Sequence, residues 1–255
     1  MRRFLLTLKY NGADFVGWQV QKNGLSVQTC LQDALEKLFG FRPNVTGCSR
    51  TDSGVHAEGY RATFEADTDK ECSRICLALN ALLPDSVSVW DCKEVDRDFH
   101  PRYNALAKEY IYRLYDSGAR DPFLKGLAWH CRGGLDTEKM QAAANYMVGK
   151  HDFRSFMASG SNIVDTTREI YSLKVQRKGH LIEISVCGDG FLYNMVRIIV
   201  GTLVAVSKGK LAPEDIPAVI DALDRSAAGQ TAPAEGLYLH KVYYSLPKKE
   251  GYDGT

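Results

Sequence analysis

The sequence lacks the spaced cysteine and histidine pairs that build zinc sites. Its seven cysteines form no CxxC pair, and its six histidines form no HxxxH or HExxH pattern. The cysteines are odd in number and scattered along the chain, at Cys30, Cys48, Cys72, Cys76, Cys92, Cys131 and Cys187. We therefore expect free thiols in a reducing compartment, a cytoplasmic location and no bound metal.

A long apolar run and an excess of charge of one sign are missing too. The chain contains no run of about 20 apolar residues, so we expect no membrane-spanning helix. The N-terminal stretch MRRFLLTLKYNG is too short in its apolar part for a signal peptide and alternates as a strand does. The 32 Lys and Arg nearly balance the 31 Asp and Glu, for a net charge of +1. A nucleic-acid partner would therefore need basic residues that gather on one face after folding.

The hydrophobic pattern that is present predicts one order of elements twice, β-α-β-β-α-β. In the first half we expect strands at 4–10, 44–48, 60–64 and 87–95, and helices at 26–39 and 73–83. Ser26 is the expected N-cap of the first helix and Gly40 its stop. In the second half we expect strands at 108–115, 169–176, 181–187 and 237–244, and helices at 136–148, 191–207 and 213–223.

This order predicts an α+β fold of two pseudo-repeated ferredoxin-like halves. The halves would span residues 1–104 and 105–255. Their antiparallel sheets would join and leave a central active-site cleft. The residues themselves do not repeat, so the duplication is inferred from element order alone.

The segment Gly47–Ala57 (GCSRTDSGVHA) places Arg50 two residues before Asp52 in a glycine-bounded turn. Such a turn can project a carboxylate into a cleft, where a nearby guanidinium keeps it ionised. The alternative is an ordinary surface turn, because Thr-Asp-Ser-Gly is good turn chemistry.

A second segment, Phe99–Tyr112 (FHPRYNALAKEYIY), ends in a strand on which Tyr110 and Tyr112 share one face. Strand tyrosines usually pack in the core with the hydroxyl satisfied at its rim. A functional tyrosine would instead stack on a base and exchange a proton. Spacing alone does not choose between the two.

The third segment, Gly188–Leu203, places Arg197 inside a helix that is apolar nearly all round. A buried guanidinium without a partner costs several kcal/mol, so Arg197 needs an acid. Asp189 lies eight positions away, too far to meet it along a helix, and Asp52 is the sharper candidate. A structural ion pair with another acid is the alternative. Gly201, one turn further on, would leave room for another backbone segment.

Together these segments resemble the tRNA pseudouridine synthase A family. The resemblance covers nearly the whole chain in order, through YNGADFVGWQVQ, SVQTCLQDAL, SRTDSGVHA, FHPRYNALAKEYIY, HDFRSF, REIYSL, GDGFLYNMVRIIVGTLVAVSKGK and TAPAEGLYLHKV. The chain departs from the family pattern at Ser49, where Gly is usual, and at Tyr60, where Gln is usual.

The resemblance implies a role for five residues. Asp52 matches the catalytic aspartate and Tyr110 the base-stacking tyrosine, while Arg50 and Arg197 match active-site arginines and Leu237 an apolar residue that lines the pocket. The implied activity converts uridines 38 to 40 of the tRNA anticodon stem-loop to pseudouridine. The implied protein is a homodimer that binds tRNA and uses no metal or organic cofactor. The basic residues expected in its cleft are Arg50, Arg61, Arg102, Lys108, Arg154 and Arg168.

Two other classes of function compete with this interpretation. A non-enzymatic RNA-binding protein on ferredoxin-like halves would show exposed aromatics on the sheet and no buried Asp–Arg pair. A hydrolase with an aspartate nucleophile is the other rival, although the metal-binding acids usual in such phosphatases are not evident.

Overall fold

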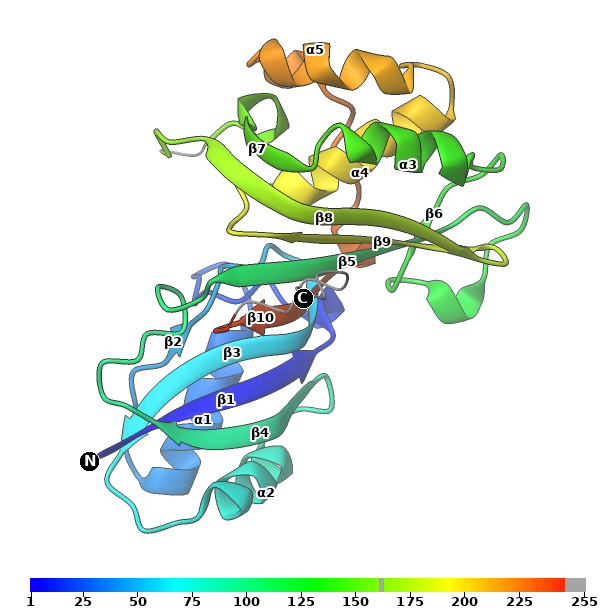
Figure 1. Cartoon of the computed structure of the whole chain (residues 1–255). Coiled ribbons are helices and arrows are strands. Elements are labelled where there is room, and N and C mark those ends of the chain that lie inside the picture. Colours follow the sequence, from blue (N-terminus) through cyan, green and yellow to red (C-terminus); the bar gives the residue numbers. More distant parts are fainter. Residues whose placement is uncertain (161–162, 246–255) are drawn as a thin grey trace, which may run out of the picture.

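The protein has a mixed α+β fold built on one large, mostly antiparallel sheet (Figure 1). The computed structural model describes residues 1–160 and 163–245. None of the helices it describes has the length and apolar character needed to cross a membrane.

The N-terminal part of the chain alternates strands and helices in the expected order. Its elements are β1 (Arg2–Tyr10), α1 (Val27–Phe39), β2 (Thr46–Gly47), β3 (His56–Ala66), α2 (Cys72–Leu82) and β4 (Val87–Val95). Helix α1 begins after Ser26, whose side chain accepts a hydrogen bond from the Thr29 amide. It ends at Gly40, which has a positive φ of 78° and leaves the helix in the left-handed conformation. Both expected caps of this helix are therefore confirmed.

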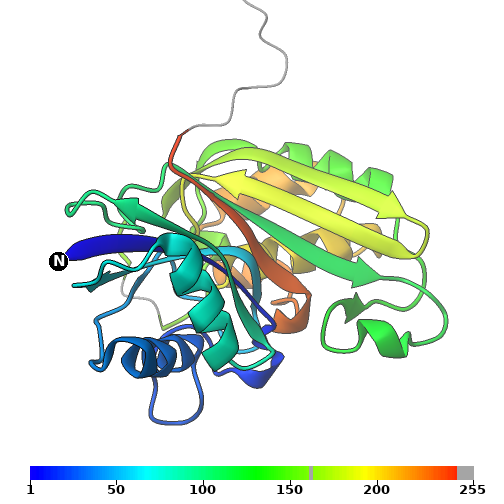
Figure 2. The ribbon, with the colours of Figure 1, turned by 90° about the horizontal axis from the view of Figure 1, so that it is seen from below.

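The C-terminal part adds the remaining elements. They are β5 (Ala107–Tyr115), β6 (Trp129–His130), α3 (Thr137–Asn145), β7 (Gly149–Asp152), β8 (Thr167–Lys178), β9 (Leu181–Gly188), α4 (Met195–Ser207), α5 (Ile216–Asp221) and β10 (Leu237–Tyr243). Figures 1 and 2 show α1 and α2 against the N-terminal strands, and α3 and α4 against the C-terminal strands, with α5 outside them.

The strand order is β4-β1-β3-β10-β5-β9-β8-β7, with β2 beside β3 and β6 beside β5. When the short strands β6 and β7 are left aside, the first strand of each half lies between the last and the third, and the second lies outside the third, as β4-β1-β3-β2 and β10-β5-β9-β8. The halves meet where β10 pairs in parallel with β3. A ferredoxin-like duplication and a boundary at residue 104 stay predictions.

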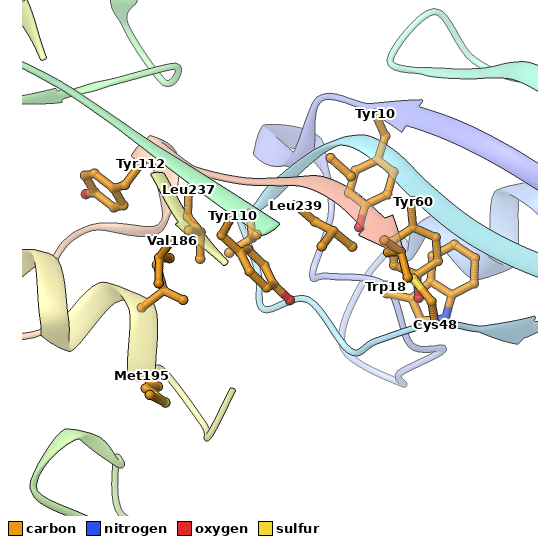
Figure 3. Close-up of a cluster of buried hydrophobic side chains, with 14 of the residues drawn as sticks. Tyr10, Trp18, Cys48, Tyr60, Tyr110, Tyr112, Val186, Met195, Leu237 and Leu239 are labelled. Atoms are coloured by element: carbon orange, nitrogen blue, oxygen red, sulfur yellow. The ribbon is translucent and has the colours of Figure 1, made fainter. Parts of the chain in front are cut away.

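A row of buried side chains crosses this junction in register. It runs through Tyr10, Ala57, Leu239, Tyr110 and Val186, on β1, β3, β10, β5 and β9. Directly paired residues on neighbouring strands point to the same face of a sheet, so this face is a single apolar surface shared by both halves. Figure 3 shows the side chains of this region together.

Several expected boundaries are wrong, and the expected helix at 191–207 is the most informative case. Helix α4 begins only at Met195, because Asn194 adopts a left-handed conformation with φ of 59°. Asp189 is therefore not on the helix of Arg197. The expected strand at 44–48 shrinks to β2, and the expected helix at 136–148 ends at Asn145 before the unexpected strand β7.

The expected close approach at Gly201 is confirmed. A Cβ added to Gly201 would lie 1.7 Å from the Gln230 carbonyl oxygen. The segment that follows is held to the same helix, since the Ala232 amide donates to the Arg197 carbonyl at 3.0 Å. A glycine is therefore required where residues 229–232 cross α4.

We predict that Gly201→Ala lowers the free energy of unfolding by about 1–3 kcal/mol, the usual effect of overpacking. Alanine favours a helix by about 1 kcal/mol over glycine, which is too little to offset a displaced backbone. Urea unfolding of both variants is the measurement, with Gly118→Ala as the control because a Cβ there meets nothing within 4 Å. Equal midpoints for Gly201→Ala and wild type would contradict the prediction.

Candidate active site

A cavity of about 670 Å³ opens where the two halves meet, and we call it the central cavity. It brings together all five residues that the family resemblance singles out: Arg50, Asp52, Tyr110, Arg197 and Leu237. They come from the loop before β3, from β5, from α4 and from the start of β10. The cavity therefore depends on elements of both halves.

The loop that carries Asp52 packs against the segment 10–18. The Trp18 amide donates to the Thr51 carbonyl at 3.2 Å, and the Thr51 hydroxyl hydrogen-bonds the Tyr10 hydroxyl at 2.8 Å. Gly17, at φ of 110°, packs so closely that a Cβ there would lie 2.4 Å from the Thr51 carbonyl oxygen. The motif YNGADFVGW thus supplies the backbone surface on which the Asp52 loop rests.

His56 fastens the other end of this loop, and the sequence reasoning missed it. Its Nδ1 accepts from the Gly12 amide at 3.0 Å, so the proton lies on Nε2, which donates to the Glu235 carbonyl at 3.1 Å. Burial lowers the pKa of His56, which favours this neutral form. The imidazole therefore ties the loop to the segment that leads into Leu237. The sequence does contain one sign of this role, because His56 belongs to the VHA sequence at the end of the Gly47–Ala57 segment.

Asp52 and Arg197 form the expected ion pair. Asp52 Oδ2 lies 3.6 Å from Arg197 Nη1, with 36% of the aspartate side chain exposed and 18% of the arginine side chain. Two further bonds orient the guanidinium, since Nε donates to the Ala232 carbonyl at 2.7 Å and Nη1 to Asn194 Oδ1 at 2.8 Å. Asp189 instead accepts from the Glu169 amide. Asp52 is thus the acid that meets Arg197.

The electrostatic balance at Asp52 differs from the expectation that Arg197 offsets burial. Burial raises the pKa of Asp52 more than the charge of Arg197 lowers it, so the pKa lies above its ordinary value. A carboxylate in this position is less well stabilised than one in water and is correspondingly more basic.

Tyr110 lines the central cavity from β5, and only 7% of it is exposed. Its ring meets the ring of Phe191 edge to face, with the centroids 5.1 Å apart, and its hydroxyl lies 3.4 Å from Ser49 Oγ. Burial raises the pKa of Tyr110 well above the ordinary value, so the phenol is protonated at neutral pH. Tyr112 is fully buried and donates to the Pro233 carbonyl, as the core interpretation of strand tyrosines predicts.

The two departures from the family pattern contact each other. The Tyr60 hydroxyl donates to the Ser49 carbonyl, and the Tyr60 ring stacks on Trp18 with centroids 4.1 Å apart. Ser49 in turn reaches Tyr110 through its hydroxyl. A buried tyrosine on β3 therefore supports the loop on which Arg50 and Asp52 lie.

Three of the six basic residues expected in the cleft line the central cavity: Arg50, Arg102 and Lys108. The other three do not. Arg61 is directed toward Thr7, Arg168 donates to backbone carbonyls of Asp165 and Thr167, and Arg154 lies in a short 3-10 turn that does not line the cavity. Across the part of the chain that the structure describes, no cluster of three or more His, Cys, Asp or Glu side chains is arranged to hold a metal ion.

Comparison of the sequence with known proteins shows the family to which the chain belongs. A family model described as tRNA pseudouridine synthase matches residues 143–245. A protein named tRNA pseudouridine synthase A from Ruminiclostridium cellulolyticum is 46% identical over 96% of this chain and 100% of its own length. A protein of the same name from Acetivibrio thermocellus is 44% identical over 96% of this chain and 100% of its length.

Among solved structures, one described as a Cbf5-Nop10-Gar1 complex is similar at 12% identity and a TM-score of 0.37, over 81% of this chain and 54% of that one. A likeness at this level does not bear on function. Full-length identity of 46% does, and the chain therefore belongs to the tRNA pseudouridine synthase A family.

Proposed function

We propose that this protein isomerises uridines 38, 39 and 40 in the anticodon stem-loop of tRNA to pseudouridine, with Asp52 as the nucleophile. Pseudouridine synthases are isomerases, and membership of the family supports this class of reaction. The observation that carries the proposal is the Asp52–Arg197 ion pair inside a cavity that Tyr110 also lines.

The reaction itself explains why a carboxylate is needed. The C1′–N1 bond of uridine breaks, the uracil turns, C1′ bonds to C5, and the C5 proton leaves, without oxidation or reduction. The freed fragment must not escape, and a carboxylate nucleophile holds it covalently. Asp52 serves this role only when ionised, and its raised pKa adds to its nucleophilic character. The Asp52 carboxylate attacks either C1′ of the sugar or the uracil ring.

The target base lies in or beside a stem and must be flipped out before it reaches Asp52. Arg50, exposed at the rim of the central cavity, would fill the space that the base leaves. Tyr110 would stack on the extruded ring and Leu237 would pack against it. The C5 proton would pass to water, or to the Tyr110 oxygen as the phenol gives up its own proton through the Ser49 hydroxyl to solvent.

The partner is a tRNA held by basic residues around the central cavity, with Arg102 and Lys108 beside Arg50. One RNA must reach a flipped base and distant phosphates at once, which favours a homodimer that offers two such faces. A cytoplasmic location follows from a tRNA substrate. A purely RNA-binding protein would have no buried Asp–Arg pair. The partly buried Asp52–Arg197 pair, with side chains 36% and 18% exposed, favours the enzyme over that alternative.

We predict that Asp52→Asn binds tRNA but forms no pseudouridine, because the amide keeps the shape and loses the negative charge. Tritium release from tRNA labelled at uridine C5 measures turnover, and filter binding measures affinity. Asp85→Asn, an exposed aspartate on the loop before β4, is the matched control. Turnover of Asp52→Asn within tenfold of wild type would remove the nucleophile assignment.

We predict that Arg197→Gln moves the acid limb of the single-turnover pH profile to higher pH. The ionised Asp52 is the active form, so wild-type activity rises as pH passes upward through the raised pKa of Asp52. Removing the positive charge raises that pKa further, whereas Arg197→Lys retains the charge and shifts the limb less. Arg120→Gln, on an exposed loop, should leave the limb in place. An unmoved limb in Arg197→Gln would show that this arginine does not control the ionisation of Asp52.

We predict that Tyr110→Leu lowers turnover at least tenfold and that Tyr110→Phe is less impaired, because base–aromatic stacking contributes about 1–3 kcal/mol and Phe retains the ring. Parallel assays of tritium release and of loss of the N-glycosidic bond test the hydroxyl. If the phenol relays the C5 proton, Phe will break that bond without releasing tritium. Tyr171→Phe, on β8 outside the cavity, is the control, and normal turnover of Tyr110→Leu would exclude Tyr110 from the site.

A further inference from the structure

A second hollow, of about 290 Å³, lies directly beside the central cavity, and we call it the side hollow. Ser49, Arg50 and Arg102 line both spaces, so Arg50 stands at the boundary between them. His100 and Tyr103 line the side hollow but not the central cavity. Both belong to the part of the FHPRYNALAKEYIY motif that the proposed reaction does not use.

The loop that carries these residues is ordered by its own hydrogen bonds. His100 Nδ1 accepts from the amides of Arg102 and Tyr103 at 3.1 and 3.2 Å. The Asn104 amide donates to the His100 carbonyl, and Asn104 Oδ1 accepts from the His100 amide at 2.6 Å. These bonds define the loop conformation before any ligand binds, which reduces the ordering cost of binding.

The same bonds decide which atom of His100 is a donor. Because Nδ1 accepts two amides, the ring proton lies on Nε2, and the imidazole presents an N–H group. Together with the guanidinium groups of Arg50 and Arg102, this gives the side hollow three donors, two of them always charged. Such a set suits a phosphate group.

Tyr103 adds an aromatic surface that no packing role explains. Its exposed fraction is 76%, the His100 ring is 4.3 Å away, and the Arg102 guanidinium lies 5.7 Å from the ring centre. An exposed ring flanked by two donors is typical of proteins that stack a nucleobase and contact its phosphate. Gln28, which also lines the side hollow, is held in place because its side chain bonds Gln19, the Val20 amide and the Val45 carbonyl.

We infer that the side hollow binds a second nucleotide of the RNA, next to the uridine in the central cavity. Its base stacks on Tyr103, and its phosphate is contacted by Arg102 and His100 Nε2. This inference rests on the proposed function, because it requires an RNA with its target base in the central cavity. The side hollow then helps to select which uridine enters, since the second nucleotide fixes the register of the strand.

The first test pairs protein variants with altered RNA. An anticodon stem-loop RNA is made with a single abasic nucleotide at each position flanking the target uridine, and KM and kcat are measured for wild type and Tyr103→Ala. With intact RNA we expect Tyr103→Ala to raise KM about tenfold and to change kcat less than about twofold, as expected for a lost stacking contact. Tyr103→Phe should restore the wild-type KM.

The abasic series identifies the contact itself. At one flanking position the abasic RNA should raise the wild-type KM by a similar factor but should not raise the KM of Tyr103→Ala further, because the same contact is already lost. The control is Phe123, an aromatic residue in the 122–124 turn that is 86% exposed. Phe123→Ala should leave KM unchanged with every RNA of the series. Additive effects at every flanking position would overturn the inference.

The second test concerns the phosphate. Arg102→Ala should reduce the slope of log affinity against log salt by about 0.7–0.9, the amount expected for one phosphate contact. Arg120→Ala, the exposed control, should leave the slope unchanged. A slope equal to that of wild type in Arg102→Ala would overturn the phosphate contact. If wild type does not isomerise the intact RNA at all, the proposed function fails; normal wild-type turnover with additive Tyr103 effects rejects only the side hollow.

Discussion

Two residue pairs, Tyr238 with His56 and Leu239 with Ala57, join β10 to β3 and thereby make one sheet of two halves. The central cavity depends on this junction. Asp52 lies just before β3, Leu237 begins β10, and Tyr110 lies on the strand that pairs with β10 on its other side. Two pairs are a short ladder, and the apolar row from Tyr10 to Val186 supplies the burial that keeps it closed.

The connection between α4 and β10 also positions side chains around the central cavity. Gly201 lets residues 229–232 lie against α4, and Gly236 lets the chain pass over Tyr112, where a Cβ would lie 2.6 Å from the ring. The same connection receives the Tyr112 hydroxyl, the His56 imidazole and the Arg197 guanidinium on its carbonyls. One irregular segment therefore positions groups from β5, β3 and α4 around the cavity.

Local patterns predicted much of this arrangement. Strand β4 has its expected bounds, 87–95, and α1 has its expected caps because capping chemistry is local. The cost of an unpaired guanidinium in an apolar helix predicted that Arg197 needs an acid, and it left Asp52 and another structural acid as alternatives. The start of α4 was not predictable, since nothing in the sequence shows that Asn194 adopts a left-handed conformation and turns its side chain to Arg197. Nor was the raised pKa of Asp52, which depends on how far the assembled cavity excludes water.

Arg197 is bonded to Ala232 twice, by its carbonyl and by its side chain. Charged side chains on a surface reorient when the charge opposite them changes, and that relaxation costs energy in each catalytic cycle. A guanidinium already held by main-chain and side-chain oxygens has little freedom to relax. The positive potential at Asp52 is therefore in place without rearrangement of Arg197, and under the proposed function it would persist while the carboxylate forms and breaks a covalent bond, which keeps the reorganisation energy of that step small.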